Sequence, residues 1–277
     1  YPHYKIDVSY DHDKTLLRGK MQVRLNRNQY PSDELLFALP GNRFLFPDER
    51  GTRKHKIAPV FSLHRFRDNI EDPKSPKGFS FGSLKIKSVS TYNKKNPNNK
   101  IFLDYNLGNN TNLEIGYSIV QGILRIFLPK ISSDFYDYPN KLIIEIEFST
   151  KFPEHLYDGV TNEMLLTSNW HPKLLNWGYD QNFDKKVVWR TDYDNPLPAT
   201  FEVNLKSTQP GILITTLGSY NLLADQIINL LYTEKPLKSF PLIFREVQNK
   251  SILKKEIGIV EENFKITKDN ETKIKAF

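Results

Sequence analysis

The most constraining feature of this sequence is a strict two-residue alternation over residues 15–26. One set of alternate positions is apolar or small: Leu17, Gly19, Met21, Val23 and Leu25. The positions between them are charged or polar: Arg18, Lys20, Gln22, Arg24 and Asn26. Successive side chains of a β-strand point to opposite faces, whereas an α-helix repeats every 3.6 residues. The alternation therefore predicts a strand with one face on a hydrophobic core and the other in water.

Short apolar or alternating segments recur along most of the chain, separated by turn-forming Asp, Asn, Gly and Pro. We expect strands at residues 6–8, 35–39, 84–89, 101–105, 124–128, 142–148, 187–190, 201–206, 212–217, 242–244, 257–260 and 264–266, and around Ile228. Only residues 162–166 indicate a helical turn. Many short strands without a long amphipathic helix predict an all-β fold, a large β-sandwich of antiparallel sheets.

The length and the strand pattern suggest how the chain is divided. A chain of 277 residues can form one large all-β domain or two smaller ones. The strand pattern pauses near residue 235, so we expect one domain over residues 1–235 and trailing strands over residues 236–277, at the start of a further domain. Residues 43–83 are irregular and basic, and we expect them to form an insertion.

Positive charge is concentrated in one part of the chain. The whole chain carries +7, but residues 50–100 contain thirteen Lys and Arg against three Asp and Glu, so the remainder is slightly negative. Such a segment can attract nucleic acid or anionic lipid. Because it lacks zinc-finger spacing, an RNA-binding aromatic motif and a helical basic face, we expect a solvated surface extension without a specific nucleic-acid site.

Composition excludes several classes of protein. The chain has no cysteine, which excludes a disulfide scaffold, a thiolate zinc site and a cysteine nucleophile. No apolar run is long enough to span a bilayer, so no membrane span is expected. The chain opens on Tyr1, Pro2 and His3 without a signal segment. A processed protein that is exported or associated with the cell envelope is one interpretation, and the compartment otherwise stays open.

The alternation stops over residues 153–178, which contain His155, Trp170, His171 and Trp177. Large aromatic side chains on irregular backbone, held by a rigid sheet, are typical of a recognition surface. They are equally typical of a loop that folds over the open end of a β-sandwich. Both interpretations stay open, and the first makes Trp170 and His171 candidate substrate-binding residues.

Motifs for catalysis are weak. No two of the six histidines have the i, i+4 spacing of an H-E-x-x-H zinc site, so we expect no metal ligands in this chain. Residues 78–82 read G-x-S-x-G, but a nucleophile elbow requires a strand before the serine and a helix after it. A charged loop precedes Ser80 and an alternating segment follows it. We therefore interpret Ser80 as a hairpin residue and expect no catalytic residue.

Several segments occur in a distinctive order between residues 4 and 218: YKIDVSYDHDKTLLRGKMQVRLNRNQYPSDELLFALPGNRF, LKIKSVS, ILRIFLPK, LIIEIEFSTKFPE, NWHPKLLNWG and PATFEVNLKSTQPGILITTLG. This ordered set resembles the start of the aminopeptidase N family of zinc metallopeptidases (gluzincins). The resemblance implies an N-terminal β-saddle domain that packs on a separate catalytic domain and helps to shape the peptide-substrate cleft.

The resemblance also implies which chemistry lies outside this chain. The family's catalytic domain carries the H-E-x-x-H zinc helix and a G-x-M-E-N loop, and neither motif occurs here. Zinc and activity would then belong to a downstream catalytic domain, with no cofactor in this chain. The family's T-Q-x-E segment is matched loosely by Thr161, Asn162 and Glu163. The resemblance therefore places Asn162 and Glu163 near the substrate's free amino group, and Glu163 is favoured because charge-assisted contacts are stronger.

A function of a different class stays open. A free-standing β-sandwich module would use residues 153–179, with Trp170, Trp177 and Tyr179, as a platform for a peptide or carbohydrate. A reading frame that continues past Phe277 into H-E-x-x-H would favour the first interpretation, and a stop codon there would favour the second.

Overall fold

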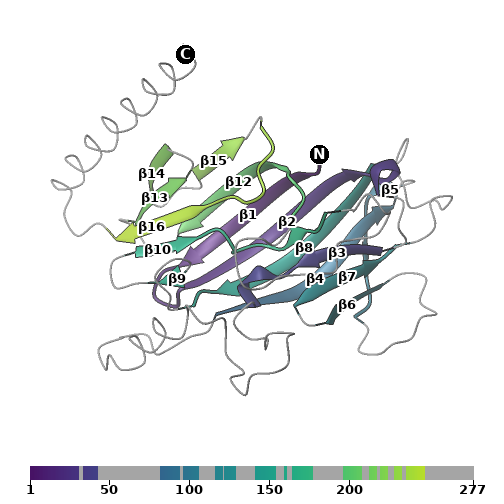
Figure 1. Ribbon diagram of the computed structural model, residues 1–277, viewed down its shortest axis with the longest axis horizontal. Coiled ribbons are helices and arrows are strands. Elements are labelled where there is room, and N and C mark those ends of the chain that lie inside the picture. Colours follow the sequence, from purple (N-terminus) through teal and green to yellow (C-terminus); the bar gives the residue numbers. More distant parts are fainter. Residues whose placement is uncertain are drawn as a thin grey trace, which may run out of the picture.

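The computed structural model describes residues 1–30, 34–42, 82–93, 96–105, 116–120, 122–128, 141–153, 159–160, 164–176, 196–207, 212–216, 219–223, 228–232 and 235–246. Within these ranges the chain forms sixteen β-strands and two short 3-10 helices, η1 (Arg27–Gln29) and η2 (Pro40–Asn42), and no α-helix. The strands form three sheets (Figure 1). The prediction of an all-β fold is confirmed.

The largest sheet has seven strands and crosses the whole molecule. Its strands, in spatial order, are β15 (Ile228–Tyr232), β12 (Thr200–Ser207), β1 (His3–Asp11), β2 (Leu16–Asn26), β8 (Lys141–Lys151), β4 (Ser83–Asn93) and β5 (Asn96–Phe102). Strands β1 and β12 run parallel, and the other neighbours are antiparallel. The N-terminal strand is therefore central to the sheet, between one partner close in sequence and one almost two hundred residues away.

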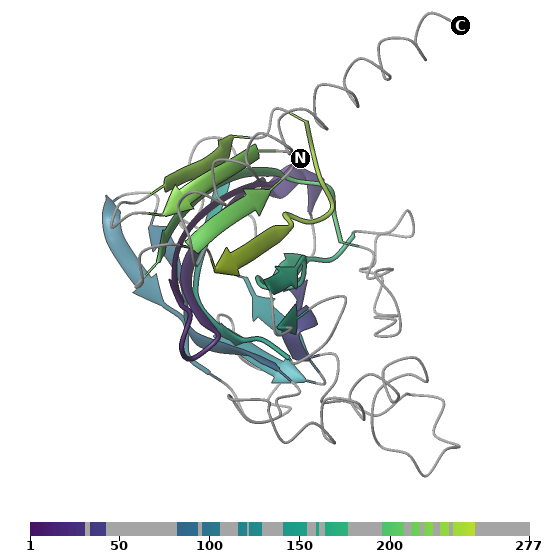
Figure 2. The ribbon, with the colours of Figure 1, turned by 90° about the vertical axis from the view of Figure 1, so that its left-hand side faces the viewer.

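Two smaller sheets complete the body. The five-stranded sheet has the order β14 (Ser219–Leu223), β13 (Ile212–Thr216), β16 (Leu242–Glu246), β10 (Met164–Thr167) and β9 (Gly159–Val160). The four-stranded sheet has the order β11 (Lys173–Leu174), β3 (Glu34–Ala38), β7 (Ile123–Phe127) and β6 (Gly116–Val120). Figure 2 shows the seven-stranded sheet as a curved layer, with the four-stranded sheet inside the curve.

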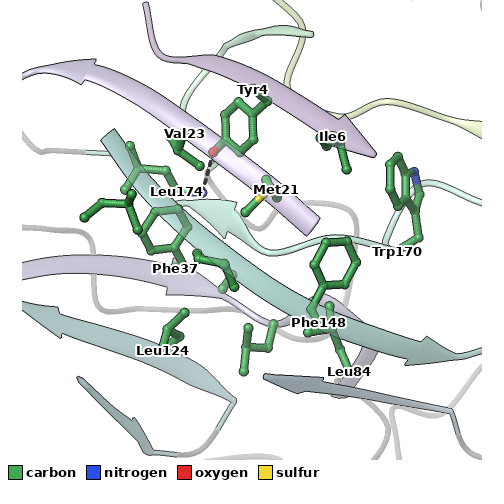
Figure 3. Close-up of a cluster of buried hydrophobic side chains, with 14 of the residues drawn as sticks. Tyr4, Ile6, Met21, Val23, Phe37, Leu84, Leu124, Phe148, Trp170 and Leu174 are labelled. Atoms are coloured by element: carbon green, nitrogen blue, oxygen red, sulfur yellow. Dashed lines mark hydrogen bonds between the residues drawn. The ribbon is translucent and has the colours of Figure 1, made fainter. Parts of the chain in front are cut away.

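The main core lies between the inner face of the seven-stranded sheet and the four-stranded sheet (Figure 3). Tyr4 of β1 packs there, and its Oη accepts a hydrogen bond of 2.9 Å from the backbone N–H of Leu174 in β11. The alternation over residues 15–26 has the predicted effect, because Leu17, Met21 and Val23 of β2 are fully buried. The outer face of the same sheet carries the polar residues between them.

One predicted element is wrong. We expected a helical turn over residues 162–166, but Met164, Leu165 and Leu166 lie in strand β10, between β9 and β16. Hydrogen bonds to two neighbouring strands outweigh a weak local helical preference. The strand expected at residues 101–105 is also displaced, since β5 begins at Asn96 and ends at Phe102.

The trailing segment contributes to the same body as the rest of the chain. Strand β16 lies between β13 and β10 in the five-stranded sheet, so residues 242–246 pair with strands on the other side of residue 235. The start of a further domain stays a prediction. The strands expected at residues 187–190, 257–260 and 264–266 lie outside the described residues, as does almost all of the basic insertion. In the described ranges, no helix is long and apolar enough to cross a bilayer.

Candidate functional site

Residues 164–176 connect the three sheets and are called the junction segment below. The segment begins with β10 in the five-stranded sheet and reaches β11 in the four-stranded sheet. Between them, the backbone carbonyl of Trp170 accepts a hydrogen bond of 2.7 Å from Thr150 Oγ1 of β8, in the seven-stranded sheet. One short stretch of irregular backbone therefore touches every layer.

Trp170 is completely buried in this junction (Figure 3). Its indole Nε1–H donates to the carbonyl of Phe240 at 2.7 Å, so the polar atom of the ring is satisfied inside the core. The ring packs against Phe148 of β8, with centroids 6.4 Å apart, and against His171, with centroids 4.8 Å apart. Trp170 thus joins the layers through its backbone and its side chain together.

His171 is buried beside Trp170 in an aromatic environment that includes Tyr4 and Phe201. Its Nδ1 lies 2.8 Å from the carbonyl of Pro172, which can only accept, so Nδ1 carries the proton. Burial and, to a smaller extent, the nearby Lys173 ammonium lower the pKa of His171, the Pro172 carbonyl opposes them, and the resulting pKa is about 3. The neutral imidazole leaves Nε2 without a hydrogen-bond partner among the described residues.

A buried lysine completes the polar part of the junction segment. Lys173 is 6% exposed, and its Nζ donates to Asn169 Oδ1 at 2.7 Å. The backbone N–H of Asn169 donates to Thr167 Oγ1 at 3.2 Å. Polar groups in the core are costly unless they are paired, and these bonds fix the local backbone between β10 and β11.

The structure places the sequence-predicted site residues in two groups. Trp170 and His171 have buried side chains that pack in the core, as expected for a loop that folds over the sandwich. A contact between either side chain and a substrate stays a prediction. Asn162, Glu163, His155, Trp177 and Tyr179 lie outside the described residues. The aromatic platform of the alternative function would therefore depend on Trp177 and Tyr179, because Trp170 is buried.

The last residue of the G-x-S-x-G motif, Gly82, directly precedes a strand. Gly82 has a positive φ of 76°, and a Cβ there would lie 2.8 Å from Pro153 Cδ, so this position requires glycine. Strand β4 begins at the next residue, Ser83, where a nucleophile elbow would begin a helix. Ser80 itself is outside the described residues.

Three of the six histidines that could act as metal ligands, His3, His12 and His171, lie in the described ranges. In the described part of the chain, no three His, Asp or Glu side chains converge on a common point. His3 Nδ1 lies 2.9 Å from Thr200 Oγ1, and His12 Nδ1 lies 3.3 Å from Tyr10 Oη. These contacts link neighbouring strands or stabilise a turn.

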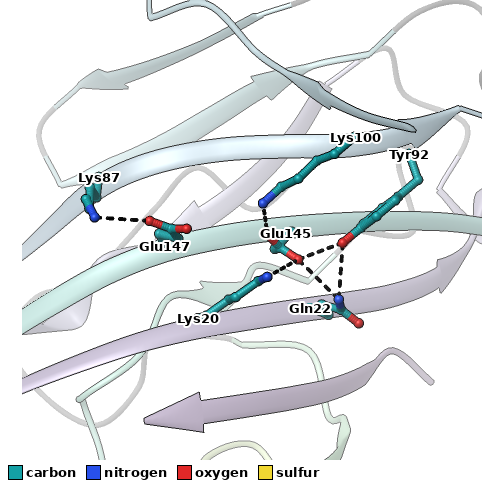
Figure 4. A network of polar contacts seen from close by, with 7 residues as sticks. All are labelled: Lys20, Gln22, Lys87, Tyr92, Lys100, Glu145 and Glu147. Atoms are coloured by element: carbon teal, nitrogen blue, oxygen red, sulfur yellow. Dashed lines mark hydrogen bonds and ion pairs between the residues drawn. The ribbon is translucent and has the colours of Figure 1, made fainter. Parts of the chain in front are cut away.

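Sequence reasoning missed a polar network on the outer face of the seven-stranded sheet (Figure 4). Its centre is Glu145 of β8, a carboxylate that is only 1% exposed. Burial alone would raise the pKa of Glu145, but four hydrogen-bond donors outweigh burial and lower it to about 2. These donors come from three other strands: Lys100 Nζ, Tyr92 Oη at 2.7 Å, Gln22 Nε2 at 3.1 Å and Lys20 Nζ at 3.1 Å. Strand order, which the sequence pattern does not reveal, brings them together.

Comparison with known proteins gives matches to solved structures alone. No protein-family model and no curated protein matches the sequence. Yeast LTA4 hydrolase is similar in its native form, with a TM-score of 0.39 and 10% identity, and in complex with bestatin, with a TM-score of 0.38 and 9% identity. Each match covers 88% of this chain and 28% of the yeast chain. This chain therefore spans little more than a quarter of the proteins that it matches.

Proposed function

We propose that this chain is the non-catalytic N-terminal domain of a zinc aminopeptidase-like protein, and that it packs on a catalytic domain and helps to shape the peptide-substrate cleft. One observation carries the proposal. The segments that resemble the aminopeptidase N family coincide with the strands that build the body, among them β1, β2, β3, β4, β7, β8, β12 and β13. The resemblance thus concerns the framework of the fold and not a single motif.

The proposal assigns a limited chemical role to this chain. Peptide hydrolysis by a metallopeptidase needs a metal ion that activates water, and that chemistry belongs to the catalytic domain. This chain would contribute walls and polar contacts to the cleft. Asn162 and Glu163 lie in the sequence between β9 and β10, and β9 is an edge strand of the five-stranded sheet.

Glu163 is the residue proposed to contact the substrate's free amino group. An ammonium group loses its water when it enters a closed cleft, so a fixed carboxylate must replace that water. Asn162 would supply a weaker, neutral contact beside it. The paired polar groups and buried Trp170 of the junction segment fix the C-terminal end of β10, the strand that follows Glu163 in the sequence.

The test uses the full-length protein. We expect stoichiometric zinc, aminopeptidase activity, and a fall in kcat/KM of about tenfold to a hundredfold for Glu163→Gln on substrates with a free amino group. Substrates with an acetylated amino group should be poor and insensitive to the change. Glu147→Gln, the same substitution on the outer face of the seven-stranded sheet, is the matched control and should leave kcat/KM unchanged.

The possible outcomes separate two claims. A full-length protein without zinc and without peptidase activity would refute the proposed function. An active enzyme whose kinetics Glu163→Gln does not change would refute only the role of Glu163 and leave the segment a structural lid.

A further inference from the structure

The outer face of the seven-stranded sheet carries a row of side chains that contains three cations and no acid. Strand register aligns the row across β12, β1, β2, β8 and β4: Lys206, Ser9, Arg18, Ser149 and Lys85. The residues next to these along each strand point inward and are buried, among them Leu205, Val8 and Leu17. The row is called the cation strip below.

The strip has a definite length. Neighbouring strands lie about 4.8 Å apart, so the backbones of the five strands span about 19 Å and successive cations along the strip are about 10 Å apart. Arg18, Lys85 and Lys206 are all exposed, and the two serines between them are half-buried. The hydroxyl groups add hydrogen-bond donors between the charges.

The cations of the strip form no ion pair within 4 Å with any described residue, although Arg18 is close enough to Asp11 to help lower the pKa of that carboxyl group. Among the described residues, Arg18, Lys85 and Lys206 have no ion-pair partner. Other acids on this face are already engaged: Glu145 by Lys20 and Lys100, and Glu147 by Lys87 (Figure 4). Glu202 is engaged by Lys5, and Asp7 by Asn204. The charges of Lys85 and Lys206 are therefore uncompensated by any described carboxylate, and that of Arg18 is offset only by Asp11, which Lys14 also engages.

The rows on both sides limit the width of anything that binds there. Asp7 and Glu147 lie in one adjacent row and Asp11 in the other, each about 7 Å from the strip along its strand. A nucleic-acid duplex or a bilayer surface is wider than this and would meet those carboxylates. The strip also lacks the aromatic side chains on which single-stranded bases stack. The occupant must be narrow, anionic and unstacked.

We infer that the cation strip binds an extended acidic segment of a partner protein, with carboxylates about three residues apart. An extended or polyproline-type chain advances about 3.1–3.3 Å per residue, so every third carboxylate falls about 9–10 Å further along and meets the next cation. The guanidinium of Arg18 suits a carboxylate because its fork donates two parallel hydrogen bonds. This interaction is independent of the proposed peptidase role, since it uses the face opposite the core.

Fluorescence anisotropy with a labelled peptide tests the inference on the full chain. The probe has about nine residues, with Glu at every third position and Ser or Gly elsewhere, and a Gln-substituted peptide is its neutral control. We expect saturable binding of the acidic peptide that weakens at least about tenfold between about 0.03 M and 0.3 M salt, because exposed charges are screened. The neutral peptide should not bind.

Substitutions in the strip locate the site. Arg18→Gln should weaken binding by about fivefold, and the combination with Lys85→Gln and Lys206→Gln by about thirtyfold or more. Arg24→Gln is the matched control, because Arg24 is an exposed arginine on the same strand and face, three rows away. It removes the same charge and should leave the affinity within about twofold. All four positions are exposed, so thermal unfolding should be nearly unchanged.

Three results would overturn the inference. Equal weakening by Arg24→Gln would mean that only net charge attracts the peptide. Absence of saturable binding at low salt would mean that the strip has no such occupant. Tighter, strip-dependent binding of a single-stranded oligonucleotide, or of vesicles with anionic lipid, would assign the surface to a different class of partner.

Discussion

Among single residues, His171 shows most clearly how burial in the junction segment restricts the protonation state of a side chain. The side chain is 1% exposed and its Nδ1–H bonds the Pro172 carbonyl, but Nε2 has no partner in the described part of the chain. An unpaired buried acceptor has a cost, and a second proton would be more costly still, because the charged ring would be buried and would lie near Lys173. The core therefore tolerates His171 only as a neutral ring.

Stability should consequently fall on mild acidification. The pKa of His171 is about 3 in the folded chain and 6.5 in an unperturbed histidine, so the unfolded chain binds the proton first. Stability is fully present above pH 6.5 and is lost progressively as the pH falls toward 3. We expect a loss of about 1.4 kcal/mol at pH 5.5 relative to neutral pH, measured by urea unfolding.

The variant His171→Asn should flatten this pH dependence, because Asn keeps an N–H donor but does not titrate. Some slope will remain, since burial also lowers the pKa of His3. His12→Asn, in the half-exposed turn after β1, is the control and should keep the slope. Measurements are made above pH 5, where Glu145 stays ionised, because its stabilising contribution is lost only as the pH falls from 4.5 toward 2. An unchanged slope in His171→Asn would assign the effect to other groups.

At the scale of elements, the close packing of β2 against β1 and β8 restricts which residue can occupy position 19. A Cβ on Gly19 would lie 2.6 Å from Phe148 Cζ of β8 and 2.7 Å from Val8 Cγ1 of β1. Both neighbours are buried and have little room to move. Gly19 therefore leaves space for the ring of Phe148, which packs in the core directly over β2.

Gly19→Ala should destabilise the protein by about 1–3 kcal/mol, through overpacking, in urea unfolding experiments. Phe148→Leu alone should also be destabilising, because it leaves a cavity. In combination, the shorter leucine gives the new methyl group space, so the double variant should be more stable than the sum of the two single changes predicts. Simple additivity would show that Gly19 and Phe148 do not contact each other in this way.

The parts of the fold that the sequence predicts are those governed by local pattern. Leu17, Met21 and Val23 are buried as the alternation requires. Alternation in β8 likewise predicts that Glu145 lies on the outer face, and it does. Alternation does not predict that Glu145 is buried there, because its burial depends on side chains from three other strands. For the candidate site, the sequence identifies the irregular segment around Trp170 but not the three-sheet junction that buries it, because that contact depends on tertiary packing.

For the whole molecule, the position of β16 shows that the body extends beyond residue 235. Phe240, Leu242 and Phe244 have buried side chains, and the Phe240 carbonyl accepts the Trp170 indole hydrogen bond. Strand β16 also supplies hydrogen bonds to β10 and β13, on either side. The last described strand, β16, thus joins β10 of the junction segment to β13 within the five-stranded sheet.

A chain truncated after residue 235 should therefore fail to fold, whereas a chain that ends at residue 246 should fold. Loss of three buried side chains removes more stabilisation than a domain of this kind usually has in reserve, about 5–15 kcal/mol. Circular dichroism and cooperative thermal unfolding would distinguish the two chains. Cooperative unfolding of the shorter chain at an unchanged temperature would instead make residue 235 a domain limit.

The parallel pairing of β1 with β12 also sets an order of events during synthesis. One edge of β1 can pair with β2 almost as soon as both leave the ribosome, but the other edge has no partner until residues 200–207 emerge. At roughly 5–20 residues per second, β1 waits about 10–40 seconds as an open strand edge. Open edges recruit other chains. Among the described strands, β1 therefore waits longest for its second partner and needs the longest protection in the nascent chain.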